Sequence, residues 1–118
     1  MPQQPRYLFS AAMDVAPERE ALFNQVYDTE HVPKLQEVPG VISVARFKTV
    51  ELTMVIGGER KRVVVENEPS YTALYEIEHP EVLTSEAWAK AVDWGRWPGE
   101  VRPYTRNRRH VLSQRLLP

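Results

Sequence analysis

The chain has 118 residues, of which 42% are hydrophobic and 26% are charged, and its formal net charge is −1. These values fit one globular domain, and the near-zero net charge provides no bulk attraction to nucleic acid or to an anionic membrane. The chain has no cysteine, which excludes disulfides, thiolate nucleophiles and thiolate metal sites. No apolar run is long enough to span a bilayer and the N-terminus lacks a secretory pattern, so we expect a cytoplasmic protein.

The first part of the chain predicts a strand, a helix and a turn. Residues 6–13 form a short apolar run that is typical of a buried strand. Pro17 favours a helix start, and the apolar residues after it recur at helical spacing to about residue 30. Pro33 disfavours helical geometry at the residue before it. We therefore expect the helix to end close to His31 and residues 32–40 to form an irregular turn.

A β-hairpin is predicted in the middle of the chain. Residues 41–56 are rich in β-branched residues and alternate for much of their length, which is typical of a strand. The pair Gly57-Gly58 is a two-residue hairpin signal, and residues 59–66 form the returning strand. The segment at about 50–68 is therefore an extra hairpin on the main fold.

The last third of the chain predicts a strand, a helix and a final strand. Residues 71–78 have strand character, and Thr84 or Ser85 can cap the N-terminus of a helix that Gly95 ends. Residues 101–116 alternate and carry many arginines, as expected for an exposed edge strand.

Without the hairpin, the order of elements is β-α-β-β-α-β, which is the ferredoxin-like split βαβ arrangement. We therefore predict a single α+β domain over residues 1–118, with a four-stranded antiparallel sheet and two helices on one face. The other face of such a sheet is uncovered and needs a partner. Because twofold dimers are the commonest oligomers, we expect a homodimer joined through this open face.

Four stretches of the sequence carry a likeness to a known group of proteins. They are FNQVYDTEHVPKLQEVPGV (23–41), ARFK (45–48), YTALYEIEHPEVLTSEAW (71–88) and GRWPGEVRPYTRNRRHVL (95–112). Together they resemble the dimeric α+β barrel superfamily, and within it the small EthD-like and uncharacterised bacterial members. The resemblance covers nearly the whole chain outside the hairpin. The superfamily includes polyketide cyclases, cofactor-free monooxygenases, lactone isomerases and haem-degrading enzymes, so the resemblance does not decide the activity.

Tyr27 and His31 are the candidate catalytic residues. They are four residues apart, so they share one face of a helix, about one turn from each other. Burial lowers the pKa of a histidine, whereas a helix C-terminus and a carboxylate from Asp28 or Glu30 would raise it. We therefore expect His31 to titrate near neutrality, as general acid–base chemistry requires. The alternative is an imidazole that caps the helix and bonds a loop carbonyl, beside a tyrosine that only packs.

The resemblance supports the same pair, because His31 occupies the place of the helix-terminal histidine and Tyr27 that of the aromatic residue one turn before it. Other aromatic residues are candidates for the wall of a substrate pocket, and each has packing in the core or at the dimer interface as its alternative. Three histidines at no ligand-like spacing predict no metal site. The candidate substrate-binding residues are Phe23, Tyr75, Trp88 and Trp97.

These features lead to one expected function and two alternatives. We expect a small-molecule enzyme that applies general acid/base chemistry, without an organic cofactor, to an aromatic or polyketide-like substrate. Cyclases, dehydratases, isomerases and cofactor-free monooxygenases are of this type. The first alternative is a non-catalytic homodimer that binds a small apolar or aromatic ligand. Haem binding comes last because the sequence has no distinctive haem signature. We expect neither a nucleic-acid nor a membrane partner.

Overall fold

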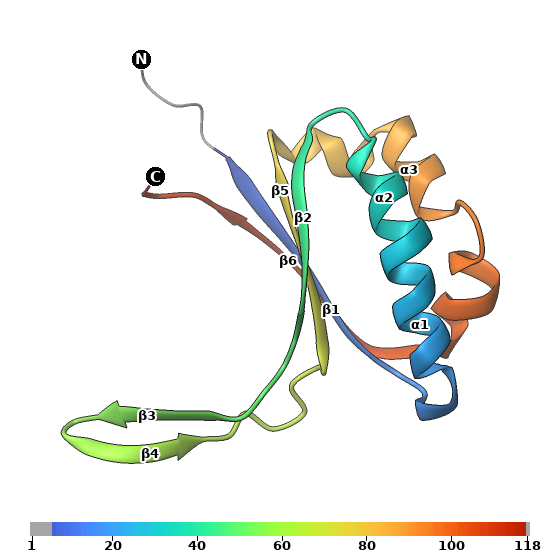
Figure 1. Cartoon of the computed structure of the whole chain (residues 1–118). Helices are drawn as coiled ribbons and strands as arrows, with labels where there is room; N and C mark the ends of the chain where they lie inside the picture. Colours follow the sequence, from blue (N-terminus) through green and yellow to red (C-terminus); the bar gives the residue numbers. More distant parts are fainter. Residues whose placement is uncertain (1–5, 118) are drawn as a thin grey trace.

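The structure is a computed structural model, and it describes residues 6–117. Four strands form one antiparallel sheet in the order β2-β5-β1-β6 (Figure 1). This order, with a helical connection after β1 and another after β5, is the ferredoxin-like α+β fold that the sequence predicts. The strands are β1 (Tyr7–Val15), β2 (Val41–Lys48), β5 (Tyr71–Ile77) and β6 (Thr105–Gln114).

All the helices lie on one face of this sheet (Figure 1). They are α1 (Glu20–Val26), α2 (Val32–Gln36) and α3 (Glu86–Val92). Two wide π-helical turns, Tyr27–His31 and Trp97–Val101, extend the helical layer. Three short 3-10 turns complete it, at Pro17–Arg19, Pro80–Thr84 and Arg102–Tyr104. Within residues 6–117, none of the helices has the length and apolar character needed to cross a membrane.

The first helix does not end at His31, so the predicted stop and the predicted irregular turn over 32–40 are wrong. The backbone N–H of Val32 bonds the carbonyl of Tyr27, five residues earlier, and α2 then continues to Gln36. Pro33 lies in the first turn of α2. Because the helix widens into a π-turn just before the proline, the chain accommodates a residue that lacks an N–H donor without leaving the helical layer.

The core lies between the helices and the sheet. Alternate residues of β5 are buried along its whole length, which places Tyr71, Ala73, Tyr75 and Ile77 against the helices. Phe23 of α1 is fully buried over this surface. This is the apolar layer that supports the site described below.

The other face of the sheet carries no helix (Figure 1). Several large apolar side chains on it are open to solvent, since Phe47 is 54% exposed, Val111 55% and Leu8 40%. We call this surface the open face. The expectation that a second copy covers it remains a prediction.

The extra hairpin forms as predicted. Strand β3 (Leu52–Ile56) pairs with β4 (Glu59–Val63), and both glycines of the turn have positive φ, 60° at Gly57 and 80° at Gly58. Such values fit the hairpin turns in which glycine is favoured. We call residues 51–66 the arm. Figure 1 shows the arm projecting away from the main sheet, on the side opposite to the helices.

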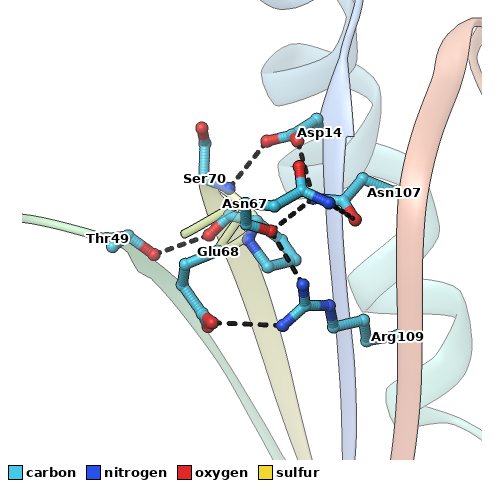
Figure 2. A network of polar contacts seen from close by, with 8 residues as sticks. Asp14, Thr49, Asn67, Glu68, Ser70, Asn107 and Arg109 are labelled. Atoms are coloured by element: carbon cyan, nitrogen blue, oxygen red, sulfur yellow. Dashed lines mark hydrogen bonds and ion pairs between the residues drawn. The ribbon is translucent and has the colours of Figure 1, made fainter. Parts of the chain in front are cut away.

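A network of polar contacts fixes the base of the arm to the sheet (Figure 2). Asp14 of β1 accepts a hydrogen bond from the backbone N–H of Ser70 at 2.8 Å and one from the side-chain amide of Asn107 at 3.0 Å. The side chains of Asn107 and Arg109 both donate to the carbonyl of Asn67, at 2.9 Å and 2.8 Å. We call these contacts the anchor. It also includes bonds from Thr49 to the carbonyls of Pro69 and Ser70.

Asn67 and Asn107 both have positive φ, 59° and 52°. Asparagine tolerates this left-handed conformation better than most residues, which explains its use at both positions. Burial acts to raise the pKa of Asp14, but the hydrogen bonds from Asn107 and Ser70 outweigh it and hold the pKa below its ordinary value. The contribution of Asp14 to stability is therefore present above its unfolded pKa and is lost as the pH falls through the lowered native value.

We predict that Asp14→Ala lowers the free energy of unfolding by about 1–3 kcal/mol at pH 7, because it leaves the Ser70 and Asn107 donors without their charged acceptor. Urea unfolding followed by circular dichroism measures this change. The control is Glu86→Ala, which removes only an exposed ion pair with Lys90 and should cost less than about 1 kcal/mol. Equal losses in the two variants would contradict a structural role for the anchor.

Candidate functional site

A cavity of about 210 Å3 lies between the helices and the sheet, beside the edge strand β6. Its floor comes from β1 and β5, its wall from the helical layer and its rim from the start of β6. Aromatic rings make up much of the surface, and two arginines stand among the lining residues. The residues around it are Phe9, Ala11, Met13, Tyr27, His31, Leu35, Tyr75, Trp88, Val92, Trp97, Arg102, Thr105, Arg108 and His110.

His31 is held in this wall by two aromatic neighbours. Its ring stacks flat on that of Trp97, with centroids 4.0 Å apart and planes 15° from parallel. The ring of Tyr27 meets it edge-on at 5.2 Å. Each of the three residues comes from one of the two π-helical turns, and such turns are frequent at functional sites. The imidazole is only 5% exposed.

The Nδ1 atom of His31 is buried and has no hydrogen-bond partner among the described residues. Buried polar atoms are nearly always satisfied, so an exception on a cavity wall needs an explanation. The carboxylates expected beside it are engaged elsewhere, because Asp28 pairs with Arg46 at 2.6 Å and Glu30 binds Arg96. The capping role would require a bond from the ring to a carbonyl. For Nδ1, no such bond exists within residues 6–117.

His31 is a neutral imidazole at physiological pH. Burial and the positive charges of Arg102 and Arg46 lower its pKa from 6.5 to about 3. The prediction that it titrates near neutrality is therefore wrong, because the fold buries the ring and supplies two guanidinium groups in place of the expected carboxylate. A neutral imidazole offers one hydrogen-bond donor and one acceptor to whatever occupies the cavity.

Two tyrosine hydroxyls lie close together in the same cavity. The hydroxyl oxygens of Tyr27 and Tyr75 are 3.5 Å apart. Burial raises the pKa of Tyr27, and burial together with the neighbouring Tyr27 raises that of Tyr75 well above its ordinary value. Both groups are therefore protonated phenols. The guanidinium of Arg46 lies 4.2 Å from the centre of the Tyr27 ring and brings positive charge to this end of the site.

Five of the six residues that the sequence nominated come together around the cavity, namely Tyr27, His31, Tyr75, Trp88 and Trp97. Phe23 does not reach the wall. It is fully buried behind it, with its ring 5.3 Å from Tyr27 and 6.0 Å from Trp97, and it packs these two rings in place.

Sequence reasoning did not nominate several residues of the wall. Leu35 is four residues after His31 and would have been found if the helix had been predicted to continue. Arg108 and His110 alternate on β6, and the ring of His110 stacks on Phe9 with centroids 5.8 Å apart. The prediction that residue 102 belongs to the final strand is wrong, because Arg102 lies in a short 3-10 turn before β6 that the fold places at the cavity. No group of three or more acidic or histidine side chains suited to a metal ion occurs in the described part of the chain.

No protein-family model matches this chain, and no curated protein matches it. Its structure is similar to the crystal structure of a protein from Bordetella bronchiseptica that is provisionally named an antibiotic biosynthesis monooxygenase. The TM-score is 0.63 at 18% sequence identity, over 98% of this chain and 100% of the other. Similarity at this level of identity concerns the fold, and it agrees with the ferredoxin-like α+β arrangement.

The burial of a neutral His31 predicts a pH dependence of stability. The native ring has a pKa of about 3, whereas the unfolded one has the ordinary value of 6.5. Below pH 6.5 the unfolded state therefore binds a proton that the native state does not bind. The free energy of unfolding falls by up to about 1.4 kcal/mol for each pH unit down towards the native pKa. Urea unfolding of wild type and His31→Gln between pH 7 and pH 4 measures this slope. We expect the wild type to lose stability faster on acidification, and parallel curves would contradict the low pKa.

Proposed function

We propose that this protein is a small-molecule enzyme and that the cavity around His31 is its active site. The observation that carries the proposal is His31, a buried residue that lines an aromatic cavity and whose Nδ1 has no hydrogen-bond partner among the described residues. A polar ligand in the cavity could hydrogen-bond the part of the imidazole that the cavity leaves accessible. The fold that the chain shares with the Bordetella bronchiseptica protein is consistent with a small-molecule enzyme or binder.

The chemistry of the wall suggests an aromatic or polyketide-like substrate. The rings of Tyr75, Trp88 and Trp97 provide flat apolar surface against which a planar molecule can pack. His31 can accept a hydrogen bond from a phenol or an enol of such a molecule. Arg102 and Arg108 line the cavity and favour an anion in it, and the charge of Arg102 already acts on His31. We propose that this protein's own residues do the chemistry without an organic cofactor.

In the proposed reaction, His31 takes a proton from the hydroxyl or from an enolisable carbon of the substrate, and the bonding electrons stay on the substrate as a phenolate or enolate. Tyr27 or Tyr75 donates a hydrogen bond to the oxygen on which the negative charge develops. The low pKa of His31 applies to the empty cavity. A substrate anion beside the ring opposes the two arginines and raises the affinity of His31 for the proton, so anion formation and proton transfer assist each other.

The fate of the anion determines the type of enzyme. It can cyclise, isomerise or lose water, or it can react with molecular oxygen. In the last case the substrate supplies the electrons, one oxygen atom enters the product and the other leaves as water. The name of the Bordetella bronchiseptica protein makes this oxygen-dependent variant the first to test. All of these reactions share the proton abstraction that we assign to His31.

One observation favours the alternative of a non-catalytic protein that binds a hydrophobic small molecule. With a pKa of about 3, His31 is a weak base until a ligand changes its surroundings. In either case we propose that the protein acts in the cytoplasm as a homodimer. The two copies would pair through the open face, where Leu8, Phe47 and Val111 present uncovered apolar side chains.

The proton abstraction can be tested without knowing the product. We predict that the protein accelerates hydrogen–deuterium exchange at enolisable positions of at least one member of a panel of polycyclic phenols and aromatic 1,3-dicarbonyl compounds, followed by proton NMR in heavy water. His31→Gln should slow this exchange by about 100-fold or more, as expected for loss of a general base. Tyr27→Phe should slow it by a smaller factor, because Tyr75 retains a hydroxyl.

The control for His31→Gln is His79→Gln, since His79 lies on the surface with its side chain 54% exposed. It should leave the exchange rate unchanged. Equal effects of the two substitutions would contradict the assignment of His31. A compound that binds in the cavity without any accelerated exchange or turnover would favour the non-catalytic alternative.

A further inference from the structure

The arm has one apolar face that nothing in the described chain covers. Leu52, Met54 and Ile56 alternate on one side of β3, and they are 48%, 44% and 45% exposed. Val63 of β4 stands opposite Leu52 on the same side. A separate two-stranded hairpin is marginally stable at best and gains stability by packing its apolar face on another surface. An uncovered strip of this kind marks an interaction site.

The other face of the arm differs in character. It carries Thr53, Arg60 and Arg62, with Val55 as its large apolar residue on β3. Arg62 also forms an ion pair with Glu51 at 2.7 Å, and both side chains are exposed. The face with Leu52, Met54 and Ile56 is therefore suited to a partner, and the face with Arg60 and Arg62 is suited to solvent.

The direction of the arm is set by the anchor. Asp14 lies between Met13 and Val15, which are both buried towards the helices, so its side chain is on the open-face side of β1. Because Asp14 and Arg109 hold residues 67–70 there, the arm leaves the sheet from the open-face side (Figure 2). Figure 1 shows the same relation, with the helices on one side of the sheet and the arm on the other.

Exposed apolar residues also continue along the chain from the open face into the arm. Phe47 stands opposite Thr72, whose neighbours in β5 face the helices, so Phe47 belongs to the open face. Val50 is 79% exposed and follows it along the chain, and Leu52, Met54 and Ile56 continue the series to the tip of β3. A partner that covers the open face must therefore also meet the arm.

We propose that the arm clasps a second copy of this chain, with the strip Leu52, Met54, Ile56 and Val63 packed on the partner. This inference rests on the homodimer of the proposed function and extends it. In a twofold dimer the same surface is used by both copies, so two arms would reach in opposite directions and each would cover part of the other copy. Lys61 and Glu59 stand opposite Met54 and Ile56 on the same face of the arm, and they pair with each other at 3.6 Å.

Sedimentation equilibrium tests the proposal with a matched pair of variants. Met54→Lys places a charge on the apolar strip, and Val55→Lys places the same charge on the opposite face of the same strand. We expect Met54→Lys to raise the dimer dissociation constant at least tenfold and Val55→Lys to change it less than about twofold. Val111→Lys, on the open face at the edge strand β6, tests the dimer independently of the arm.

The outcomes separate the two proposals. If Val111→Lys weakens the dimer and Met54→Lys does not, the open-face dimer stands and the arm proposal is overturned. A monomeric wild type overturns both, whereas the exchange assay of the cavity does not depend on this result. Met54→Lys could also weaken the dimer by disturbing the structure of the hairpin, so a direct measurement of the contact in the wild type is needed. In a dimer mixed from methyl-labelled and unlabelled chains, the Met54 methyl should show an intermolecular NOE, and its absence in a confirmed dimer overturns the proposal.

Discussion

The stacking of His31 on Trp97 is the contact on which the rest of the site depends. It joins two π-helical turns that are about 70 residues apart in the sequence, so it also ties the C-terminal helical segment to the first helix. The stacked imidazole is buried and is one of the residues that line the cavity. Phe23 supports this arrangement from behind by packing on Tyr27 and Trp97.

Electrostatic interactions and burial then set the protonation states of the residues in the site. The carboxylates nearest to His31 in the sequence are drawn away by Arg46 and Arg96, and the charges that remain effective at the ring are positive. The cavity therefore holds a neutral imidazole and protonated phenols in a field that attracts anions. In the proposed function, such a site stabilises the anionic form of a substrate more than its neutral form. Catalysis requires this difference, whereas binding alone does not.

Much of the fold follows from local patterns, because strand alternation, the Gly57-Gly58 turn and the order of elements each depend on nearby residues. The relation between Tyr27 and His31 is also local and was predicted from their spacing. The continuation of the helix through Pro33 could not be predicted, since it depends on a π-turn that the core stabilises. The low pKa of His31 was missed for a similar reason. It depends first on the burial of the ring and then on Arg102, and only the tertiary fold sets either of them.

The most direct test of this account is the nitrogen NMR spectrum of the His31 ring, recorded with and without an aromatic ligand that carries an acidic hydroxyl. We expect a neutral ring in the free protein at pH 7, and a large shift of a ring-nitrogen signal when the ligand's hydroxyl bonds the imidazole. The direction of the shift would show whether the proton has moved to the ring. A ligand that fills the cavity and leaves both ring-nitrogen signals of His31 unchanged would contradict the assignment of His31 as the residue that receives the substrate.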